Sequence, residues 1–208
     1  MARADPTTRL ESDLWDSCLL YVAGLDEAGR GALAGPVAVG AVILPHGDKA
    51  LLSSALAGVR DSKQLTPRAR EALAPRIREI ALAWSVGFAD AHEIDAQGIV
   101  RATRLAAIRA LHQFSITPQY LLTDFRLELP QLEISQTSIV KGDAHCLSIA
   151  CASILAKVER DALMRELDLR HPGYGLGKHK GYGTQAHRSA LRRKGLTSVH
   201  RRSFSFKR

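Results

Sequence analysis

The chain has 208 residues, of which 46% are hydrophobic, and it carries a formal net charge of +8. This apolar fraction excludes a disordered chain, and no run of about 18 apolar residues predicts a membrane-spanning helix. The basic charge favours nucleic acid or another polyanion as a partner, although a basic protein without such a partner would have the same composition.

The N-terminal 18 residues are interpreted as an extension that lacks the apolar core of a secretory signal. The three cysteines, Cys18, Cys146 and Cys151, form no CxxC pair, which argues against a disulfide framework or a zinc site. Cys146 and Cys151 are predicted to be packing residues of a helix. We therefore expect a cytoplasmic protein with no membrane association.

Two apolar segments, residues 19–26 and 36–44, predict buried strands joined by a glycine-rich link as an antiparallel hairpin. The first segment ends in the adjacent acids Asp26 and Glu27. Successive strand residues point to opposite faces, so two adjacent acids inside a buried strand would place one carboxylate in the core. Either the strand ends at this pair or the pair holds a metal ion.

A helix is predicted over residues 65–82, with Thr66 as its N-cap and Pro67 at its first position. Pro75 should kink or split this helix, because proline removes one backbone hydrogen bond and clashes with the preceding turn. Alternating large apolar residues then predict a strand over residues 83–90.

Strands and helices alternate in the second half of the chain. Four elements are predicted there: a helix over 99–114, a strand over 119–124, a strand over 136–143 and a long helix over 144–167. The two strands end in Asp124 and Asp143. From residue 168 onward the composition changes to glycine, histidine, lysine and arginine, which predicts a small helical appendage.

These elements predict an α/β fold with a five-stranded mixed sheet flanked by helices. We divide the chain into an N-terminal extension (1–18), a catalytic domain (19–167) and a C-terminal helical subdomain (168–208). If the last two strands run parallel to the first, their carboxyl ends gather at one edge of the sheet, where ligands bind in open α/β sheets.

Asp26, Asp124 and Asp143 would meet at that edge. Taken singly, Asp143 could be a helix N-cap and Asp124 a turn residue. Together, in a basic chain, they favour Mg²⁺ or Mn²⁺, which prefer oxygen ligands. Two such ions about 3.5–4 Å apart can hold the attacking and leaving oxygens of a phosphodiester. An acidic pocket on a basic protein therefore predicts a nuclease.

Five motifs make the chain closely similar to the bacterial type 2 ribonucleases H, the ribonuclease HII family. The motifs are GLDEAGRGALAGPV from residue 24, DSKQLT from 61, KGDAHCLSIACASILAKVERD from 141, HPGYGLGKHKGYGT from 171 and HRRSF from 200. The resemblance extends from about Tyr21 to Phe204, although Ala32 stands where the family usually has proline. The segment TDFRLELP also departs from the small residues that commonly follow the third acid, which makes Asp124 the least secure of the aligned acids.

The resemblance implies a ribonuclease H-like fold whose C-terminal subdomain binds substrate. It implies a monomer that cleaves the RNA strand of RNA–DNA hybrids, and single ribonucleotides in duplex DNA, leaving 5′-phosphate and 3′-hydroxyl ends. The catalytic and metal-binding acids that it implies are Asp26, Glu27, Asp124 and Asp143. The residues that it implies for ribonucleotide recognition are Gly29, Arg30, Gly31 and Tyr182.

Several basic residues are further candidates for substrate contacts. Lys63, His179 and Lys180 could contact phosphate, and the alternative for Lys63 is an ordinary solvated lysine. Arg201 and Arg202 either grip phosphates or tie down the tail. Two rival functions stay open: a nuclease or integrase of the same superfold that cuts DNA, and a nucleic-acid-binding module that would need no carboxylate cluster.

Overall fold

The computed structural model describes residues 5–125 and 127–205. Within them a five-stranded mixed sheet has the strand order β3-β2-β1-β4-β5. The strands are β1 (Val22–Ala28), β2 (Val37–Ile43), β3 (Ala83–Ala89), β4 (Tyr120–Asp124) and β5 (Ser135–Ile139). The predicted α/β class and the five-stranded sheet are confirmed, with strand boundaries displaced by at most four residues.

The pairing of the central strands explains where the first two acids lie. β1 and β2 form the predicted antiparallel hairpin, in which Asp26 is opposite Gly40. β4 runs parallel to β1, but their pairing stops at Leu25 and Thr123, and β5 runs parallel to β4. β1 continues to Ala28, so the expectation that the strand ends at the acids is wrong. The acids lie instead where β1 and β4 separate.

The helices number more than the sequence predicted. They are α1 (Arg9–Trp15), α2 (Lys49–Ala55), α3 (Pro67–Ile80), α4 (Ala91–Gln97), α5 (Ile99–Leu111), α6 (Gly142–His145), α7 (Leu147–Arg170), α8 (Leu176–His179) and α9 (Gln185–Lys194), with a 3₁₀ turn over Ser62–Gln64. The unpredicted helices α1, α2 and α4 have seven residues each, too few for a clear apolar period. In the part of the chain that is described, no helix is long and apolar enough to cross a membrane.

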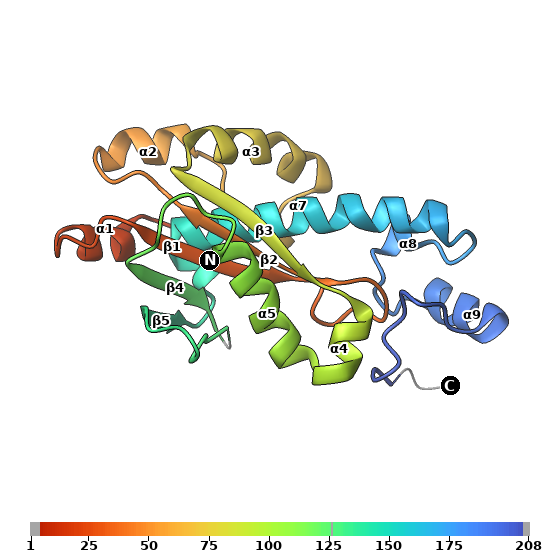
Figure 1. The fold of residues 1–208 in the computed structure, drawn as a ribbon. Coiled ribbons are helices and arrows are strands. Elements are labelled where there is room, and N and C mark those ends of the chain that lie inside the picture. Colours follow the sequence, from red (N-terminus) through yellow and green to blue (C-terminus); the bar gives the residue numbers. More distant parts are fainter. Residues whose placement is uncertain (1–4, 126, 206–208) are drawn as a thin grey trace.

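Helices cover both faces of the sheet, with α7 along one face and α5 along the other (Figure 1). Glycines in the strands permit this close approach. A Cβ on Gly40 would lie 2.2 Å from the Ala152 carbonyl oxygen of α7, and one on Gly87 would lie 2.0 Å from the Ala106 carbonyl oxygen of α5. Asp26, opposite Gly40, is therefore enclosed between β1 and α7.

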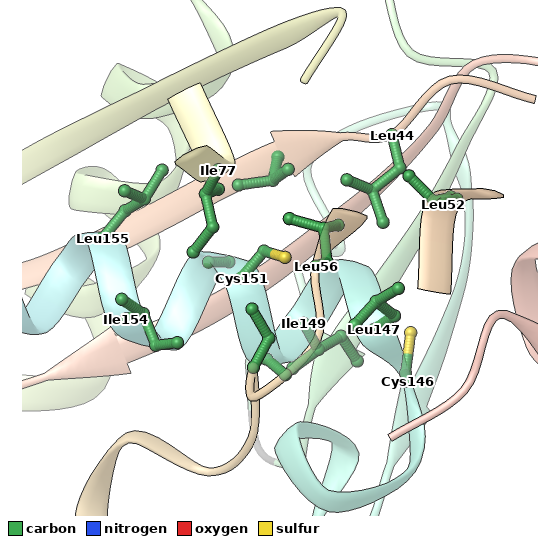
Figure 2. Close-up of a cluster of buried hydrophobic side chains, with 14 of the residues drawn as sticks. Leu44, Leu52, Leu56, Ile77, Cys146, Leu147, Ile149, Cys151, Ile154 and Leu155 are labelled. Carbon is green, nitrogen blue, oxygen red and sulfur yellow. The ribbon is translucent and has the colours of Figure 1, made fainter. Parts of the chain in front are cut away.

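The core on the α7 face joins that helix to the segments that contain α2 and α3. Ile149, Ile154 and Leu155 of α7 belong to one buried cluster with Leu52 and Ile77, and Figure 2 shows Leu155 and Ile77 on the same side of α7. Cys146 and Cys151 belong to the same cluster, which confirms that they are packing residues, although Cys146 lies at the N-cap of α7 rather than in a helix, and burial raises the pKa of both thiols. The scaffold under the acids is therefore a dry apolar layer.

Two local expectations need correction. Pro75 does not split the helix, since α3 continues through it to Ile80 with Pro75 on the exposed side, and whether it kinks the helix stays a prediction. Asp143 is neither at a strand end nor an N-cap. β5 ends at Ile139, Asp143 is the second residue of the short helix α6, and Lys141, in the left-handed conformation, is the N-cap.

The two ends of the chain pack against α7. Glu11 of α1 is buried and its Oε1 accepts a hydrogen bond from Ser148 N, in the first turn of α7, at 2.8 Å. At the other end α7 continues to Arg170, and α8 and α9 form the predicted helical appendage beside its C-terminal half (Figure 1). Because α7 crosses residue 167, the division of the chain at that point stays a prediction.

Candidate active site

Three carboxylates meet where β1 and β4 separate. Asp26, Glu27 and Asp124 each offer an oxygen, and these oxygens all lie within 4.8 Å of one another. Asp26 is 2% exposed, and Glu27 and Asp124 are partly buried. Parallel pairing of β1 with β4 brings residues that are about a hundred positions apart in the sequence to the same edge.

The donor set of this cluster fits a divalent cation. Asp26 Oδ1 accepts a hydrogen bond from Glu27 N at 2.7 Å, whereas Asp26 Oδ2 and Glu27 Oε2 are buried and make no hydrogen bond within the described part of the chain. Buried acceptor oxygens without a partner are costly, and hard cations such as Mg²⁺ and Mn²⁺ take carboxylate oxygens as ligands. The oxygens that lack hydrogen bonds are thus the ones that a metal ion would use.

The electrostatics of the cluster also favour a bound cation. Burial, and then the charge of Glu27, raise the pKa of Asp26 well above its usual range. Burial also raises the pKa of Glu27, although Arg30, whose Nη1 lies 4.0 Å from Glu27 Oε1, opposes that shift. Without a bound cation the charged forms of Asp26 and Glu27 are disfavoured. The electrostatics therefore favour a cation that would neutralise these carboxylates.

Asp143 lies beside the three-acid cluster. It lines a pocket together with Asp61, Lys63 and Asp124, and it is not one of the three acids within 4.8 Å. Asp124 Oδ1 accepts a hydrogen bond from Gly142 N at 2.7 Å, which ties β4 to the start of α6. Burial, and then the charge of Asp61, raise the pKa of Asp143. Asp124 therefore belongs both to the cluster and to the pocket that Asp143 lines.

Asp61 and Lys63 come from the DSKQLT motif. Asp61 was not among the predicted site residues, although it lies two positions before Lys63 in the same motif. Lys63 Nζ is 3.6 Å from Asp143 Oδ2, and its side chain is 75% exposed. Burial alone would lower the pKa of Lys63, but the carboxylates around it, Asp26 first, raise it. Lys63 is therefore a charged group that faces both the acids and the solvent.

The two glycines of the GRG motif meet different requirements. Gly29 has a φ of +83°, and a Cβ there would lie 1.9 Å from Arg160 Nε, so the fold itself demands glycine. Gly31 is exposed, and a Cβ there would meet nothing within 4 Å. Only Gly31 therefore has space around it for an approaching ligand.

Two buried arginines hold the segment from Gly29 to Pro36. Arg201 donates to the carbonyls of Gly29 at 2.8 Å, Arg30 at 2.8 Å and Gly35 at 3.0 Å. Arg160 donates to the carbonyls of Pro36 at 2.8 Å, Ala34 at 3.2 Å and Lys180 at 2.9 Å. Arg201 is 2% exposed, so of its two predicted alternatives the structure selects tying down the chain.

The role of Arg160 in binding backbone carbonyls was not predicted from the sequence, because an arginine in a helical pattern is interpreted as a surface residue. The one available signal was its place within the KVERD end of the third motif.

The C-terminal candidates lie beside this segment. The carbonyl of Gly181 accepts a hydrogen bond from Leu33 N at 2.8 Å. The Tyr182 ring is 38% exposed, and the Arg160 guanidinium lies 5.7 Å from its centroid. Lys180 Nζ donates to the Gly177 carbonyl at 2.5 Å. His179 Nε2 lies 2.8 Å from the Tyr174 carbonyl, and its Nδ1 is buried. The polar groups of Lys180 and His179 are therefore directed into the protein.

Comparison with known proteins agrees with this arrangement. The model of the ribonuclease HII family matches residues 23–207. Ribonuclease HII of Dehalococcoides mccartyi is 50% identical over 195 residues, which are 94% of this chain and 90% of that protein. The Thermus thermophilus enzyme is 50% identical over 196 residues, which are 94% and 91% of the two chains.

Among solved structures, ribonuclease H2 from Pyrococcus horikoshii superposes with a TM-score of 0.72 and 27% identity, covering 88% of this chain and 93% of that one. The range matched by the family model includes both the acids on the sheet and the helical C-terminal part that contains Tyr182. The chain therefore belongs to the ribonuclease HII family and is a hydrolase of the ribonuclease H class.

Proposed function

We propose that this ribonuclease H is a metal-dependent endonuclease that cleaves the RNA strand of RNA–DNA hybrids and single ribonucleotides embedded in duplex DNA. The observation that carries the proposal is the pair of buried oxygens without donors, Asp26 Oδ2 and Glu27 Oε2, beside a segment held in place by Arg201. The ends produced are a 5′-phosphate and a 3′-hydroxyl.

Asp26, Glu27 and Asp124 are the residues that would hold Mg²⁺ or Mn²⁺, and Asp143, which lines a pocket with Asp124, completes the set. Bound divalent cations supply an activated water and compensate charge on the leaving 3′-oxygen. The protein's own contribution is to keep the carboxylates dry and close together, so that their charge is directed to the cation rather than to solvent.

Recognition of the ribonucleotide falls to Gly29, Arg30, Gly31 and Tyr182. The exposed backbone at Gly31 has no Cβ to keep a sugar at a distance, and the 2′-hydroxyl is the group that distinguishes RNA from DNA. The exposed face of Tyr182 packs on the sugar that follows the ribonucleotide. A deoxyribose fits against the ring, whereas a ribose there would crowd it.

Among Lys63, His179 and Lys180, Lys63 is the most exposed to solvent, so it is the best placed of the three to contact a phosphate. His179 and Lys180 support the loop that carries Tyr182, since their polar atoms bind backbone carbonyls. The substrate partners are RNA–DNA hybrids and ribonucleotide-containing duplex DNA. We further propose that the enzyme acts in the cytoplasm as a monomer, and that residues 168–208 bind substrate.

The decisive experiment uses a DNA duplex with one ribonucleotide, an all-RNA hybrid and an all-DNA duplex, each with and without Mg²⁺, with products mapped by end labelling. We expect a single cut at the ribonucleotide in the presence of Mg²⁺, and no cut without it. Cleavage of the all-DNA duplex would instead support a nuclease that cuts DNA. Binding without cleavage in any metal would support the non-catalytic module.

Tyr182 is tested with the same substrates. Tyr182→Ala should lower kcat/KM at the single ribonucleotide far more than it lowers hybrid binding, whereas Tyr182→Phe should retain much of the activity because the ring shape matters. Equal losses on the single-ribonucleotide and all-RNA substrates, with a lowered melting temperature, would leave Tyr182 only an anchoring role.

A further inference from the structure

The backbone of Tyr182 is contacted by a chain of two buried imidazoles. His187 Nδ1 lies 3.1 Å from the Tyr182 carbonyl oxygen, and His187 Nε2 lies 3.2 Å from His200 Nε2. His200 Nδ1 lies 3.0 Å from Thr197 N. His187 is 0% exposed and His200 is 1% exposed, so water does not compete for these contacts.

The Thr197 N–H donor at one end of this chain and the Tyr182 carbonyl acceptor at the other fix the tautomer of each ring. The Thr197 N–H can only donate, so His200 Nδ1 accepts and neutral His200 carries its proton on Nε2. That proton is directed at His187 Nε2, which must therefore accept. Neutral His187 then carries its proton on Nδ1 and donates it to the Tyr182 carbonyl. Burial lowers the pKa of both imidazoles, that of His200 to about 4, so both are neutral at pH 7.

The relay completes a set of hydrogen bonds along residues 180–182. The Lys180 carbonyl accepts from Arg160, the Gly181 carbonyl from Leu33 N, and the Tyr182 carbonyl from His187. Lys180 has a φ of 54°, a conformation that costs a non-glycine residue free energy and persists only where the surroundings impose it. The path of the loop, and with it the position of the Tyr182 ring, thus depends on these partners.

A second donor also reaches the Tyr182 carbonyl, since Thr184 N lies 2.8 Å from it. A carbonyl oxygen has two lone pairs, so both bonds can form together. Both bonds are local in sequence, but only His187 is linked further, because its Nε2 contacts His200 of the C-terminal HRRSF motif. His179 stacks on the His187 ring with centroids 4.3 Å apart, which restricts that ring to one orientation.

We propose that His187 and His200 are positioning residues that hold Tyr182 in place to read the nucleotide after the ribonucleotide. Neither side chain touches the substrate. The inference rests on the proposed function of Tyr182. It gives the HRRSF motif two tasks, because Arg201 holds the segment after Gly29 while His200, its neighbour, holds the tyrosine through His187.

Two amide substitutions separate this role from simple packing. His187→Asn places an N–H near the Nδ1 position and keeps a donor for the Tyr182 carbonyl. His187→Gln fills more of the cavity and places its amide near Nε2, which keeps the contact with His200 but loses the donor to Tyr182. We expect the Asn variant to cleave the single-ribonucleotide duplex better than the Gln variant by roughly fivefold, the worth of about one hydrogen bond.

On the all-RNA hybrid the two variants should be equal, and the exposed His112→Gln should match the wild type on both substrates. If packing alone mattered, the larger Gln side chain would retain more activity. Equal losses, or a better Gln variant, would therefore overturn the inference. All assays are run well below the melting temperature of each variant.

Tyr182→Ala in the same assay separates the failure of this inference from that of the proposed function. If Tyr182→Ala loses single-ribonucleotide cleavage while the Asn and Gln variants are equal, the inference alone fails. If Tyr182→Ala keeps the wild-type preference, Tyr182 does not read the substrate, and the inference is overturned together with that part of the proposed function.

Nuclear magnetic resonance of the wild-type enzyme tests the relay without any activity measurement. Long-range ¹H–¹⁵N correlation at pH 7 should show His187 protonated at Nδ1, which is the minor tautomer of free histidine, and His200 protonated at Nε2. Protonation of His187 at Nε2 would overturn the relay.

Discussion

The acid cluster and the loops that flank it differ in how their buried polar groups are paired. Around Asp26 and Glu27, buried carboxylate oxygens lack donors and burial raises both pKa values. Around Gly29–Pro36 and Lys180–Tyr182, backbone carbonyls are paired with buried arginine and histidine side chains. The proposed cation site thus keeps its charges uncompensated, whereas the loops proposed to contact the sugar keep their backbone fixed.

The largest expected effect comes from removing the charge of the cluster. Asp26→Asn should lower cleavage by more than about a hundredfold, since even indirect supports of metal ligands contribute roughly 10–100-fold. Hybrid binding should survive, because the lost charge repels phosphate. Single-turnover cleavage and hybrid binding are measured side by side, and we expect losses of the same order for Glu27→Gln, Asp124→Asn and Asp143→Asn. Wild-type cleavage by Asp124→Asn would remove that residue from the site.

The second prediction concerns the segment from Gly29 to Pro36, whose backbone carbonyls are hydrogen-bonded by buried arginines. Arg201→Met leaves three backbone carbonyls without a charged donor, whereas Arg202→Met changes an exposed neighbour whose side chain is outside the core. We expect Arg201→Met to lose at least about 3 kcal/mol of unfolding free energy, because a hydrogen bond to a charged group contributes roughly 1.5–3 kcal/mol. For a chain of this size that is a fall of roughly 6 °C or more in melting temperature.

Arg202→Met is the matched control for that experiment and should melt near the wild-type temperature. If Arg202 contacts a phosphate, its loss should reduce the slope of log K against log salt by about 0.9. Equal melting temperatures for the two variants would contradict the holding role assigned to Arg201.

The third prediction concerns pH in the presence of a chelator. An aspartate in the unfolded chain titrates near pH 3.9, and the folded pKa of Asp26 lies well above that value. As pH rises from about 4 toward the folded pKa, the unfolded state gives up a proton that the folded state retains, so stability falls. Asp26→Asn lacks this proton. The variant should therefore melt above the wild type by a margin that widens from about pH 4 to pH 7, and a constant margin would contradict the prediction.

The smallest effect is expected at Lys63. Its ammonium is exposed and lies 3.6 Å from Asp143, and such exposed ion pairs contribute at most about 1 kcal/mol. Lys63→Met should therefore leave the melting temperature almost unchanged while raising the KM for the hybrid by up to roughly tenfold, through loss of a phosphate contact. An unchanged KM would favour the ordinary solvated lysine.

The strands and the long helices could be predicted because each carries its own local signal. The apolar segments that become β1 and β2, the Thr66 cap and the alternation in β3 depend on neighbours within a few residues. The seven-residue helices α1 and α2 were not predicted, because so short a segment shows little periodicity. α4 was not predicted either, although its Asp90–Glu93 capping box was present in the sequence.

The strand content, the four candidate acids and the motifs of a ribonuclease HII could be predicted from local patterns in the sequence. That β1 continues past its acids, that Asp143 lies on α6 and that Arg201 is buried could be seen only in the folded molecule. These outcomes depend on contacts between residues far apart in the chain, such as the carbonyl of Gly29 with Arg201. Local patterns register a residue's type and its spacing, whereas burial and partnership are properties of the packed molecule.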